Sequence, residues 1–339
     1  MRITLALALV TLFVSCQNED QEPPISDFSV FEVPAHFPDP VYDFDGNPIT
    51  EEGFELGRKL FYDKRLSRGS QVSCGSCHAQ VHAFADHGVP LSVGVDGREG
   101  RRNSPGLYNL AWTEAFMWDG GINHIEVMPI APITDSVEMD ISLADLLDYL
   151  QSETEYPQEF ETAFGSTEIT TADLLKALAQ FQGSIVSDGS RYDQFIKGEY
   201  IPTEEQMRGM ELFEANCSGC HAGVLQTDFS YRNNGLDADF TDLGRGRITQ
   251  NPADNGKFRV PSLRNVALTN PYMHDGRFFT LEQVLDHYSE GITASATVDP
   301  ALADGIQLSE EEKEDIIEFL YTLSDFELLG DLRFSEPAK

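Results

Sequence analysis

The chain has 339 residues, of which 41% are apolar, and its formal net charge is −34. This length and composition favour a folded protein of two ordinary domains and exclude a disordered chain. The excess of 57 acidic over 23 basic residues argues against nucleic acid, and against an anionic membrane surface, as a partner.

The first segment of the chain is predicted to direct export. Residues 1–15 contain Arg2 and then an apolar run that is too short to cross a bilayer, which is the pattern of a secretory signal peptide. Cys16 follows directly and resembles the lipid-modified cysteine of a bacterial lipoprotein, with ordinary cleavage as the alternative. Residues 16–30 would then form a flexible tether. We therefore expect an exported, periplasmic protein that is lipid-anchored through Cys16.

The other four cysteines occur in two copies of the pattern Cys-x-x-Cys-His, at residues 74–78 and 217–221. Two disulfides would be the default for four cysteines in an exported protein, but this spacing is the attachment site of c-type haem. The two thiols of each copy would bind the haem vinyl groups, and the histidine would ligate the iron. The sequence therefore predicts two covalently attached c-type haems. Their attachment residues would be Cys74, Cys77 and His78 in the first copy, and Cys217, Cys220 and His221 in the second.

A longer repeat surrounds these motifs. Residues 104–121 align without a gap on residues 260–277, at a constant offset of 156, and 8 of the 18 columns are identical. A duplicated haem-binding module explains the recurrence. With the same offset, Pro132 in the first module falls opposite Tyr288 in the second. One iron would then face a phenol and the other a group that cannot ligate, so we hypothesise that one haem does chemistry and the other transfers electrons.

The predicted elements around the motifs are helices. An amphipathic helix is expected over residues 171–186, and capping boxes that begin at Thr203 and Ser309 predict two further helix starts. Residues 187–202 are expected to link the modules. We expect a mostly α-helical protein of two tandem c-type cytochrome modules with long loops and one covalent haem each. The expected domains are residues 31–198 and residues 199–339, with one haem each.

The motifs resemble those of the bacterial di-haem cytochrome c peroxidases, including their MauG-like branch. The resemblance extends over residues 50–325. It includes CGSCH, GRRNSPGLYN, FMWDGG, PIAPITDSVEM, CSGCH, RVPSLRNVALTNPYMHDGRFFTLEQVLDHY and LSEEEKEDIIEFLYTL. The resemblance implies that the first haem is the peroxidatic one and that the second transfers electrons.

The resemblance also implies roles for single residues. Trp118 matches the tryptophan between the two haems, where an aromatic ring shortens the steps of electron transfer. Glu138 matches the distal glutamate that moves a proton between the two peroxide oxygens. The ligands of a Ca²⁺ ion at the module interface are matched by Asn103, Thr269 and Pro271, and oxygen ligands suit this hard cation.

The second iron has several candidate ligands besides its histidine. Many family members have Met where this chain has Tyr288, whereas the MauG-like branch has Tyr. A tyrosinate stabilises oxidised iron, and we expect Tyr288 to be the ligand. Met273 is the alternative, although its repeat partner Met117 stands in the same turn and favours a packing role for both. His274 and His287 are weaker candidates.

The first iron is expected to be open on its distal side. Family members that receive electrons from a donor close it with a histidine in the loop after the attachment motif, and the matching segment SVGVDGREG has none. His82 would lie on the proximal side, whereas His87 is the alternative that could swing over the iron. Met128 replaces the family's glutamine beside the distal pocket. His36 and His124 are expected only to pack or to meet solvent.

These features predict a peroxidase that reduces hydrogen peroxide to water at the first haem. Its electrons would come through the second haem from a small cytochrome or cupredoxin. One alternative is MauG-like, peroxide-dependent oxidation of side chains on a partner protein. Another is a di-haem electron carrier without catalysis. A homodimer is left open.

Overall fold

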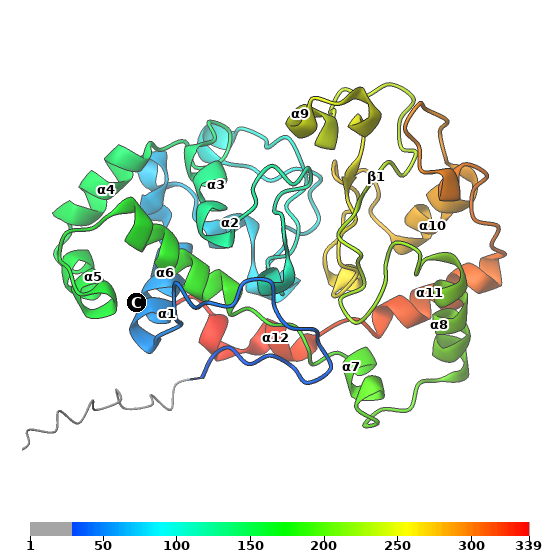
Figure 1. Ribbon diagram of the computed structural model, residues 1–339, viewed down its shortest axis with the longest axis horizontal. Helices are drawn as coiled ribbons and strands as arrows, with labels where there is room; N and C mark the ends of the chain where they lie inside the picture. The colour runs from blue at the N-terminus through cyan, green and yellow to red at the C-terminus, as the bar shows by residue number, and fades with distance from the viewer. Residues whose placement is uncertain (1–28, 339) are drawn as a thin grey trace, which may run out of the picture.

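The computed structural model describes residues 29–338, which form two helical lobes side by side (Figure 1). The mostly α-helical fold class is confirmed. The first lobe contains α1 (Glu51–Tyr62), α2 (Cys74–Cys77), α3 (Ile130–Thr134), α4 (Leu143–Ser152), α5 (Tyr156–Phe164) and α6 (Thr171–Gly183). The second contains α8 (Glu204–Asn216), α9 (Arg245–Thr249), α10 (Leu281–Glu290) and α11 (Glu310–Tyr321), with β1 (Tyr231–Arg232) antiparallel to β2 (Phe258–Arg259). The helices α7 (Arg191–Ile196) and α12 (Phe326–Gly330) join the lobes.

Each lobe is built on one close crossing of two helices. In the first, α1 packs on α6 at Gly57, where a Cβ atom would lie 2.0 Å from the Ala177 carbonyl oxygen. In the second, α8 packs on α11 at Gly209, where a Cβ atom would lie 1.9 Å from the Asp315 carbonyl oxygen. Only glycine permits either contact. Equivalent rings meet beside the crossings: Phe61 and Phe181 at 5.0 Å and 52°, and Phe213 and Phe319 at 5.0 Å and 50°.

The sequence repeat is also a repeat of backbone conformation. Asn109 and Asn265 both adopt the left-handed region, with φ of 54° and 57°. Met117 and Met273 do the same, with φ of 67° and 75°. Non-glycine residues seldom adopt this conformation, so its recurrence at the same offset supports duplication of the module. Matching antiparallel bridges join Phe116 to Ile122 and Tyr272 to Phe278.

The helix starts agree with the sequence, and the linker is more structured than expected. Thr203 and Ser309 form the predicted capping boxes at the starts of α8 and α11, and the helix expected over residues 171–186 is α6. The stretch 187–202 contains a helix, α7, which the sequence did not predict. Ser190 caps α7 with Asp193, whose side chain is fully buried. The stretch does connect the lobes, as expected, but it is a structured connection and not an open loop.

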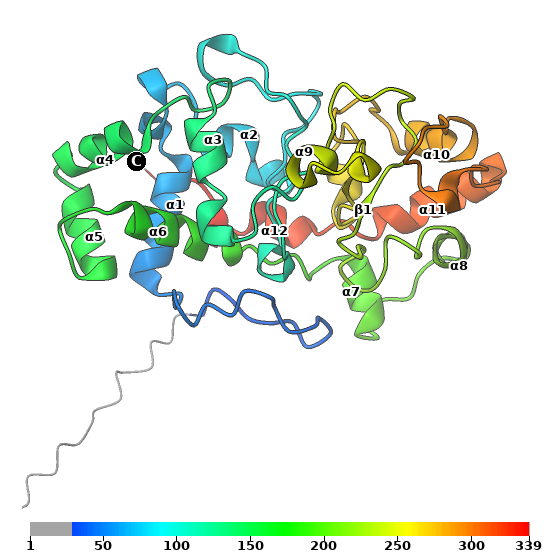
Figure 2. The same cartoon turned by 45° about the horizontal axis from the view of Figure 1, so that its top comes forward.

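Segments from both ends of the described chain cross between the lobes. The segment before α1 runs along the first lobe toward α7 (Figure 2). Its Phe37 forms an apolar cluster with Trp112 of the first lobe and Leu225 of the second. After α11 the chain returns to the first lobe, where Leu328 and Phe334 are buried in the core. The predicted division into residues 31–198 and 199–339 stays a prediction, with the last of these residues packed on the first lobe.

Within residues 29–338, none of the helices combines the length and the apolar character that a bilayer crossing requires. The predicted signal peptide and Cys16 lie outside the described residues.

Candidate active site

The first attachment site lies at the short helix α2. Ser73 and Ser76 cap its start reciprocally, and His78 follows directly after its last residue. The His78 Nδ1 atom lies 2.8 Å from the carbonyl oxygen of Phe84, which can only accept, so Nδ1 carries the proton. The Nε2 lone pair is then free for a metal. Burial lowers the pKa of His78, which favours the neutral ring that metal binding requires.

The second attachment site repeats this arrangement. The His221 Nδ1 atom donates to the carbonyl oxygen of Gln226 at 3.3 Å, and burial lowers the pKa of His221. Phe84 and Gln226, which supply the two carbonyl groups, both have left-handed φ, of 56° and 54°. The backbone therefore turns in the same way at both sites and leaves the Nε2 atom of each histidine available to a metal.

None of these four cysteines forms a disulfide with another. Burial raises the pKa of Cys74 to about 12, of Cys77 to about 11 and of Cys217 to about 12. They are neutral thiols in apolar surroundings, unlike the low-pKa cysteines of dithiol redox enzymes. This chemistry fits thioether attachment to an apolar macrocycle.

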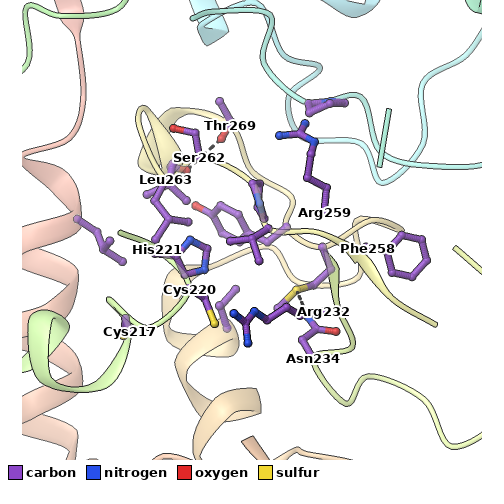
Figure 3. A pocket seen from close by; sticks show the side chains of 18 of the residues that line it. Cys217, Cys220, His221, Arg232, Asn234, Phe258, Arg259, Ser262, Leu263 and Thr269 are labelled. Carbon is purple, nitrogen blue, oxygen red and sulfur yellow. Dashed lines mark hydrogen bonds between the residues drawn. The ribbon is translucent and has the colours of Figure 1, made fainter. Parts of the chain in front are cut away.

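A cavity of about 260 Å³ adjoins the second attachment site, and we call it the second cavity after that site (Figure 3). Its lining combines the attachment residues, two candidate distal ligands and many apolar side chains, as a bound haem requires. The lining includes Cys217, Cys220, His221, Met273, Tyr288, Leu225, Val260, Leu285 and Leu320.

Tyr288 and Met273 both reach this cavity. Burial raises the pKa of Tyr288 to about 12, so the phenol is neutral until a metal displaces its proton. The Met273 sulfur accepts a hydrogen bond of 3.2 Å from the Asn234 side chain. His274 also lines the cavity, but its ring stacks on Phe258 with a centroid separation of 3.7 Å. The Asn234 side chain also acts on the Tyr288 hydroxyl, so Tyr288 and Met273 remain the two candidates that line the cavity without such stacking.

His287 does not belong to the cavity lining within the described residues. Its Nε2 atom lies 2.8 Å from the carbonyl oxygen of Asn234, to which it donates. His287 therefore fixes the backbone of the residue that also contacts Met273.

Glu138 lies close to the first attachment site. Its carbonyl oxygen accepts from the Val95 N–H at 2.9 Å, and a Cβ atom on Gly94 would lie 2.2 Å from the Val137 carbonyl oxygen. Burial raises the pKa of Glu138, although the side chain keeps exposed surface, and together these fit a carboxyl that lines a recess. Burial is the main cause that raises the pKa of both thiols of the first attachment motif, and the charge of Glu138 is one of the smaller causes that act in the same direction.

Pro132 lies in α3, next to Glu138 in space. Its carbonyl oxygen accepts from the Met139 N–H at 3.1 Å. This bond connects α3 to the chain that carries the Glu138 carboxyl. Proline has no side-chain atom that could ligate iron.

Trp118 is held by both lobes. Its indole Nε1 donates to the Asn103 carbonyl oxygen at 2.8 Å, and its own carbonyl accepts from the Arg259 N–H at 2.8 Å. The Trp118 ring lines the second cavity although the residue belongs to the first module. The structure therefore places this ring at the junction of the modules.

The three predicted calcium ligands line the same cavity wall. Asn103, Thr269 and Pro271 all contribute to it. The carbonyl oxygens of Thr269 and Pro271 accept no hydrogen bond from residues 29–338, and neither does the Asn103 Oδ1 atom. Three free oxygen atoms of this kind fit Ca²⁺, which binds carbonyl groups readily.

The remaining histidines have structural contacts. His82 and His87 stack with ring centroids 4.2 Å apart, and His87 is exposed. His124 caps a turn by accepting the Glu126 N–H at 3.3 Å. The expectation that His36 only packs or meets solvent was wrong, because its Nε2 donates to the buried Asp193 carboxylate at 2.7 Å.

Met128, expected beside the distal pocket, is buried in the core of the first lobe.

Among the lining residues that the sequence interpretation missed are Asn234 and Arg259. Arg259 had a signal, since it stands at the repeat offset from Asn103 and directly before the matching block. Asn234 lies in a loop with no repeat partner, and only the fold brings it to Met273.

Two cytochrome modules, each with paired free thiols and an oriented histidine, define a c-type cytochrome with two haems. A family model described as di-haem cytochrome c peroxidase matches residues 51–200, and a cytochrome c model matches residues 206–324. The methylamine utilization protein MauG of Methylorubrum extorquens is 37% identical over 86% of this chain and 83% of its own length. The chain belongs to the di-haem cytochrome c peroxidase family, and it carries two c-type haems.

Other relatives come from both branches of the family. The cytochrome c551 peroxidase of Pseudomonas aeruginosa is 34% identical over 85% of this chain and 83% of its own length. A crystal structure of a MauG-like protein associated with microbial copper homeostasis superposes with a TM-score of 0.84 at 36% identity. It covers 90% of this chain and 98% of that chain.

Proposed function

We propose that this protein reduces hydrogen peroxide to water at the haem of the first module. Its electrons arrive through the second module from a small cytochrome or cupredoxin. The observation that carries the proposal is the Glu138 carboxyl, whose charge reaches the thiols of Cys74 and Cys77 and whose pKa burial raises. An electron carrier has no use for a proton-transfer group at that place. The relatives named cytochrome c peroxidase agree with this reading.

Glu138 acts as the proton carrier. The haem, when bound, supplies an iron that coordinates peroxide and provides electrons for cleavage of the O–O bond. The Glu138 carboxylate accepts the proton of one peroxide oxygen and returns it to the other, which leaves as water. One peroxide takes up two protons and two electrons and gives two waters. The Val95 hydrogen bond and the close contact at Gly94 hold the Glu138 backbone in place during both transfers.

Trp118 links this chemistry to the second module. Its ring lines the second cavity, while its indole N–H and its carbonyl group are bonded in both lobes. A fixed aromatic ring divides a long electron-transfer distance into shorter steps.

A second candidate function, MauG-like oxidation of side chains on a partner protein, is favoured by Tyr288. A tyrosinate ligand stabilises oxidised iron, so it opposes uptake of electrons from a mild donor. The MauG of Methylorubrum extorquens and the MauG-like structure are among the relatives. In this case the electrons come from the partner protein instead of a small redox protein.

EPR spectroscopy of the oxidised protein tests the two functions. We expect its EPR spectrum to contain a high-spin ferric signal that one equivalent of peroxide removes. If reduced cytochrome or cupredoxin then restores the signal over many turnovers, the peroxidase is supported. Restoration only by a partner protein, with oxidised side chains found by mass spectrometry, supports the MauG-like function. If peroxide changes the EPR spectrum of neither the oxidised nor the half-reduced protein, both the peroxidase and the MauG-like function are contradicted. The protein would then be an electron carrier without catalysis.

Two further expectations belong to this proposal. Asn103, Thr269 and Pro271 hold a Ca²⁺ ion at the module junction, through oxygen atoms that have no other hydrogen-bond donor in the described residues. The protein is exported to the periplasm and anchored by a lipid on Cys16. Metal analysis of the purified protein, and labelling of cells with a fatty-acid probe, test the two expectations.

A further inference from the structure

Two arginines line the second cavity, and their surroundings differ (Figure 3). The Arg232 guanidinium is paired with Asp228 at 3.0 Å and with Asp299 at 2.8 Å. The Arg259 guanidinium forms no hydrogen bond or ion pair with residues 29–338, and its Nε atom is buried. The cavity therefore contains one cation that the described protein does not neutralise.

This cation cannot leave the cavity wall easily. Arg259 lies in β2, opposite Tyr231 of β1, and its N–H donates to the Trp118 carbonyl at 2.8 Å. Both neighbours hold the backbone, so the side chain starts from a fixed point. Burial lowers the pKa of the Arg259 guanidinium, because its surroundings solvate the charge less well than water does. Buried charges in proteins are paired or bind an ion, and an unpaired one indicates a missing anionic partner.

The haem expected in this cavity supplies such an anionic partner. A haem carries two propionate groups, whose carboxylates match the planar, bidentate donor geometry of arginine. We propose that the Arg259 guanidinium pairs with a propionate carboxylate of the haem attached to Cys217 and Cys220. The proposal rests on the presence of this haem, which family membership shows, and not on the peroxide chemistry proposed above.

The pairing gives Arg259 a positioning role. Its backbone is bonded to Trp118 and its side chain holds the haem, so one residue sets the haem in relation to the indole ring. The guanidinium also keeps the propionate ionised and offsets its negative charge near the iron. The reduction potential of the second haem then depends little on pH, because the propionate does not titrate.

The test is the reduction potential of the second haem in Arg259→Gln, measured by spectroelectrochemistry over a range of pH. Without the cation, the pKa of the buried propionate rises into the measured range. We expect a potential close to that of the unaltered protein at low pH, where the propionate is protonated. The potential should fall as pH rises, because the ionised and now unpaired carboxylate stabilises ferric iron. EPR of samples poised at each potential assigns the change to the second haem.

Two variants complete the test. Arg191→Gln removes the same charge from an exposed position on α7 outside the cavity lining, and should leave the potential unchanged. Arg259→Lys keeps the cation and should restore a potential that is nearly independent of pH. A pH-independent potential in Arg259→Gln overturns the proposal, and so does a shift confined to the first haem.

A direct spectroscopic measurement covers the case in which Arg259→Gln does not fold. With haem labelled by ¹³C at its propionates, infrared spectra of Arg259→Lys should show a shifted carboxylate band, because lysine cannot form the bidentate contact. An unshifted band overturns the proposal. Neither measurement uses peroxide, so failure here is distinct from failure of the proposed function.

Discussion

The indole N–H of Trp118 and the carbonyl oxygen of Asn103 are joined by a hydrogen bond of 2.8 Å. Asn103 is the repeat partner of Arg259, whose N–H bonds to the Trp118 carbonyl. Equivalent positions of the two modules thus hold opposite ends of one tryptophan. The duplication has supplied a symmetrical support for a residue that occurs in one module only.

Replacement of Trp118 by leucine is expected to slow electron transfer between the haems by about tenfold or more, equivalent to a barrier increase of ~1.4 kcal/mol. The reason is that the aromatic ring at the junction is lost while the haems stay in place. Trp118→Phe keeps an aromatic ring, so its rate of electron transfer should lie between those of the unaltered protein and Trp118→Leu. Its free energy of unfolding should fall by about 1 kcal/mol because the hydrogen bond is missing. Stopped-flow spectroscopy of the half-reduced protein measures the rate.

Trp112→Phe is the matched control. Its indole N–H also donates to a carbonyl oxygen, that of Pro38 at 2.7 Å, but the ring lies in the apolar cluster outside the second cavity. It should lose similar stability and transfer electrons at the normal rate. Normal transfer in Trp118→Leu would show that the path avoids this ring.

Replacement of Glu138 by glutamine is expected to lower the rate of reaction with peroxide by about 10²- to 10⁴-fold, the range typical of a lost general acid–base group. Glutamine keeps the shape but cannot take up the proton. Glu168→Gln, in an exposed loop before α6, should react normally. Full activity of Glu138→Gln would assign the proton transfer elsewhere and would remove the main argument against an electron carrier.

The raised pKa of Glu138 also predicts how the rate of reaction with peroxide depends on pH. The first step needs the carboxylate form of Glu138, and burial raises its pKa above the usual value. The rate of reaction with peroxide should therefore decline on the acid side, and should begin to do so at a higher pH than an ordinary glutamate would cause. This acid limb should disappear from the residual rate of Glu138→Gln. A limb that persists unchanged there belongs to another group.

Replacement of Tyr288 by methionine is expected to raise the reduction potential of the second haem, because a thioether ligand favours ferrous iron. The visible spectrum of the oxidised protein should change at the same time. Met273→Leu, which removes the rival ligand from the same cavity, should leave both properties nearly unaltered. If Met273→Leu changes the spectrum and Tyr288→Phe does not, methionine is the ligand.

The parts of this site that lie in the repeat could be predicted from the sequence. Trp118 stands inside the aligned block, and Tyr288 falls opposite Pro132 when the offset of 156 is extended. The attachment residues are recognised by their own motif instead, because their offset is 143. The paired helix crossings could be expected too, since Gly57 and Gly209 precede the two attachment motifs in similar helices. In each case the local sequence favours the conformation that the fold adopts, so the feature can be predicted from the sequence.

Contacts between distant segments could not be predicted in this way. His36 and Asp193 are 157 positions apart, and neither local sequence predicts the hydrogen bond between them. Arg259 has a visible place in the repeat, but its lack of a partner is a property of the folded cavity. The helix α7 was missed because glycine and serine around it suggest a loop, whereas the reciprocal hydrogen bonds of Ser190 and Asp193 cap its first turn.

The buried ion pair between Asp193 and Arg264 yields a prediction about stability. The Arg264 Nη1 atom lies 2.9 Å from Asp193 Oδ2, and both side chains are fully buried. Asp193→Asn leaves the guanidinium without its counter-charge, and should reduce the free energy of unfolding by about 3–5 kcal/mol. Chemical denaturation of the haem-loaded protein measures the loss. Asp237→Asn, at a half-exposed pair with Arg277, should change stability by less than about 1 kcal/mol.

The same pair predicts how stability depends on pH. Despite the opposing effect of burial, hydrogen bonds and charge from Arg264 lower the pKa of Asp193 from 3.8 to about 2. A carboxyl whose pKa is depressed in the folded state stabilises it fully above the unfolded value. That contribution, ~2 kcal/mol, is lost as pH falls from near 4 toward 2. Asp193→Asn should therefore lose less stability over this interval than the unaltered protein, and equal losses would mean that Asp193 does not titrate there.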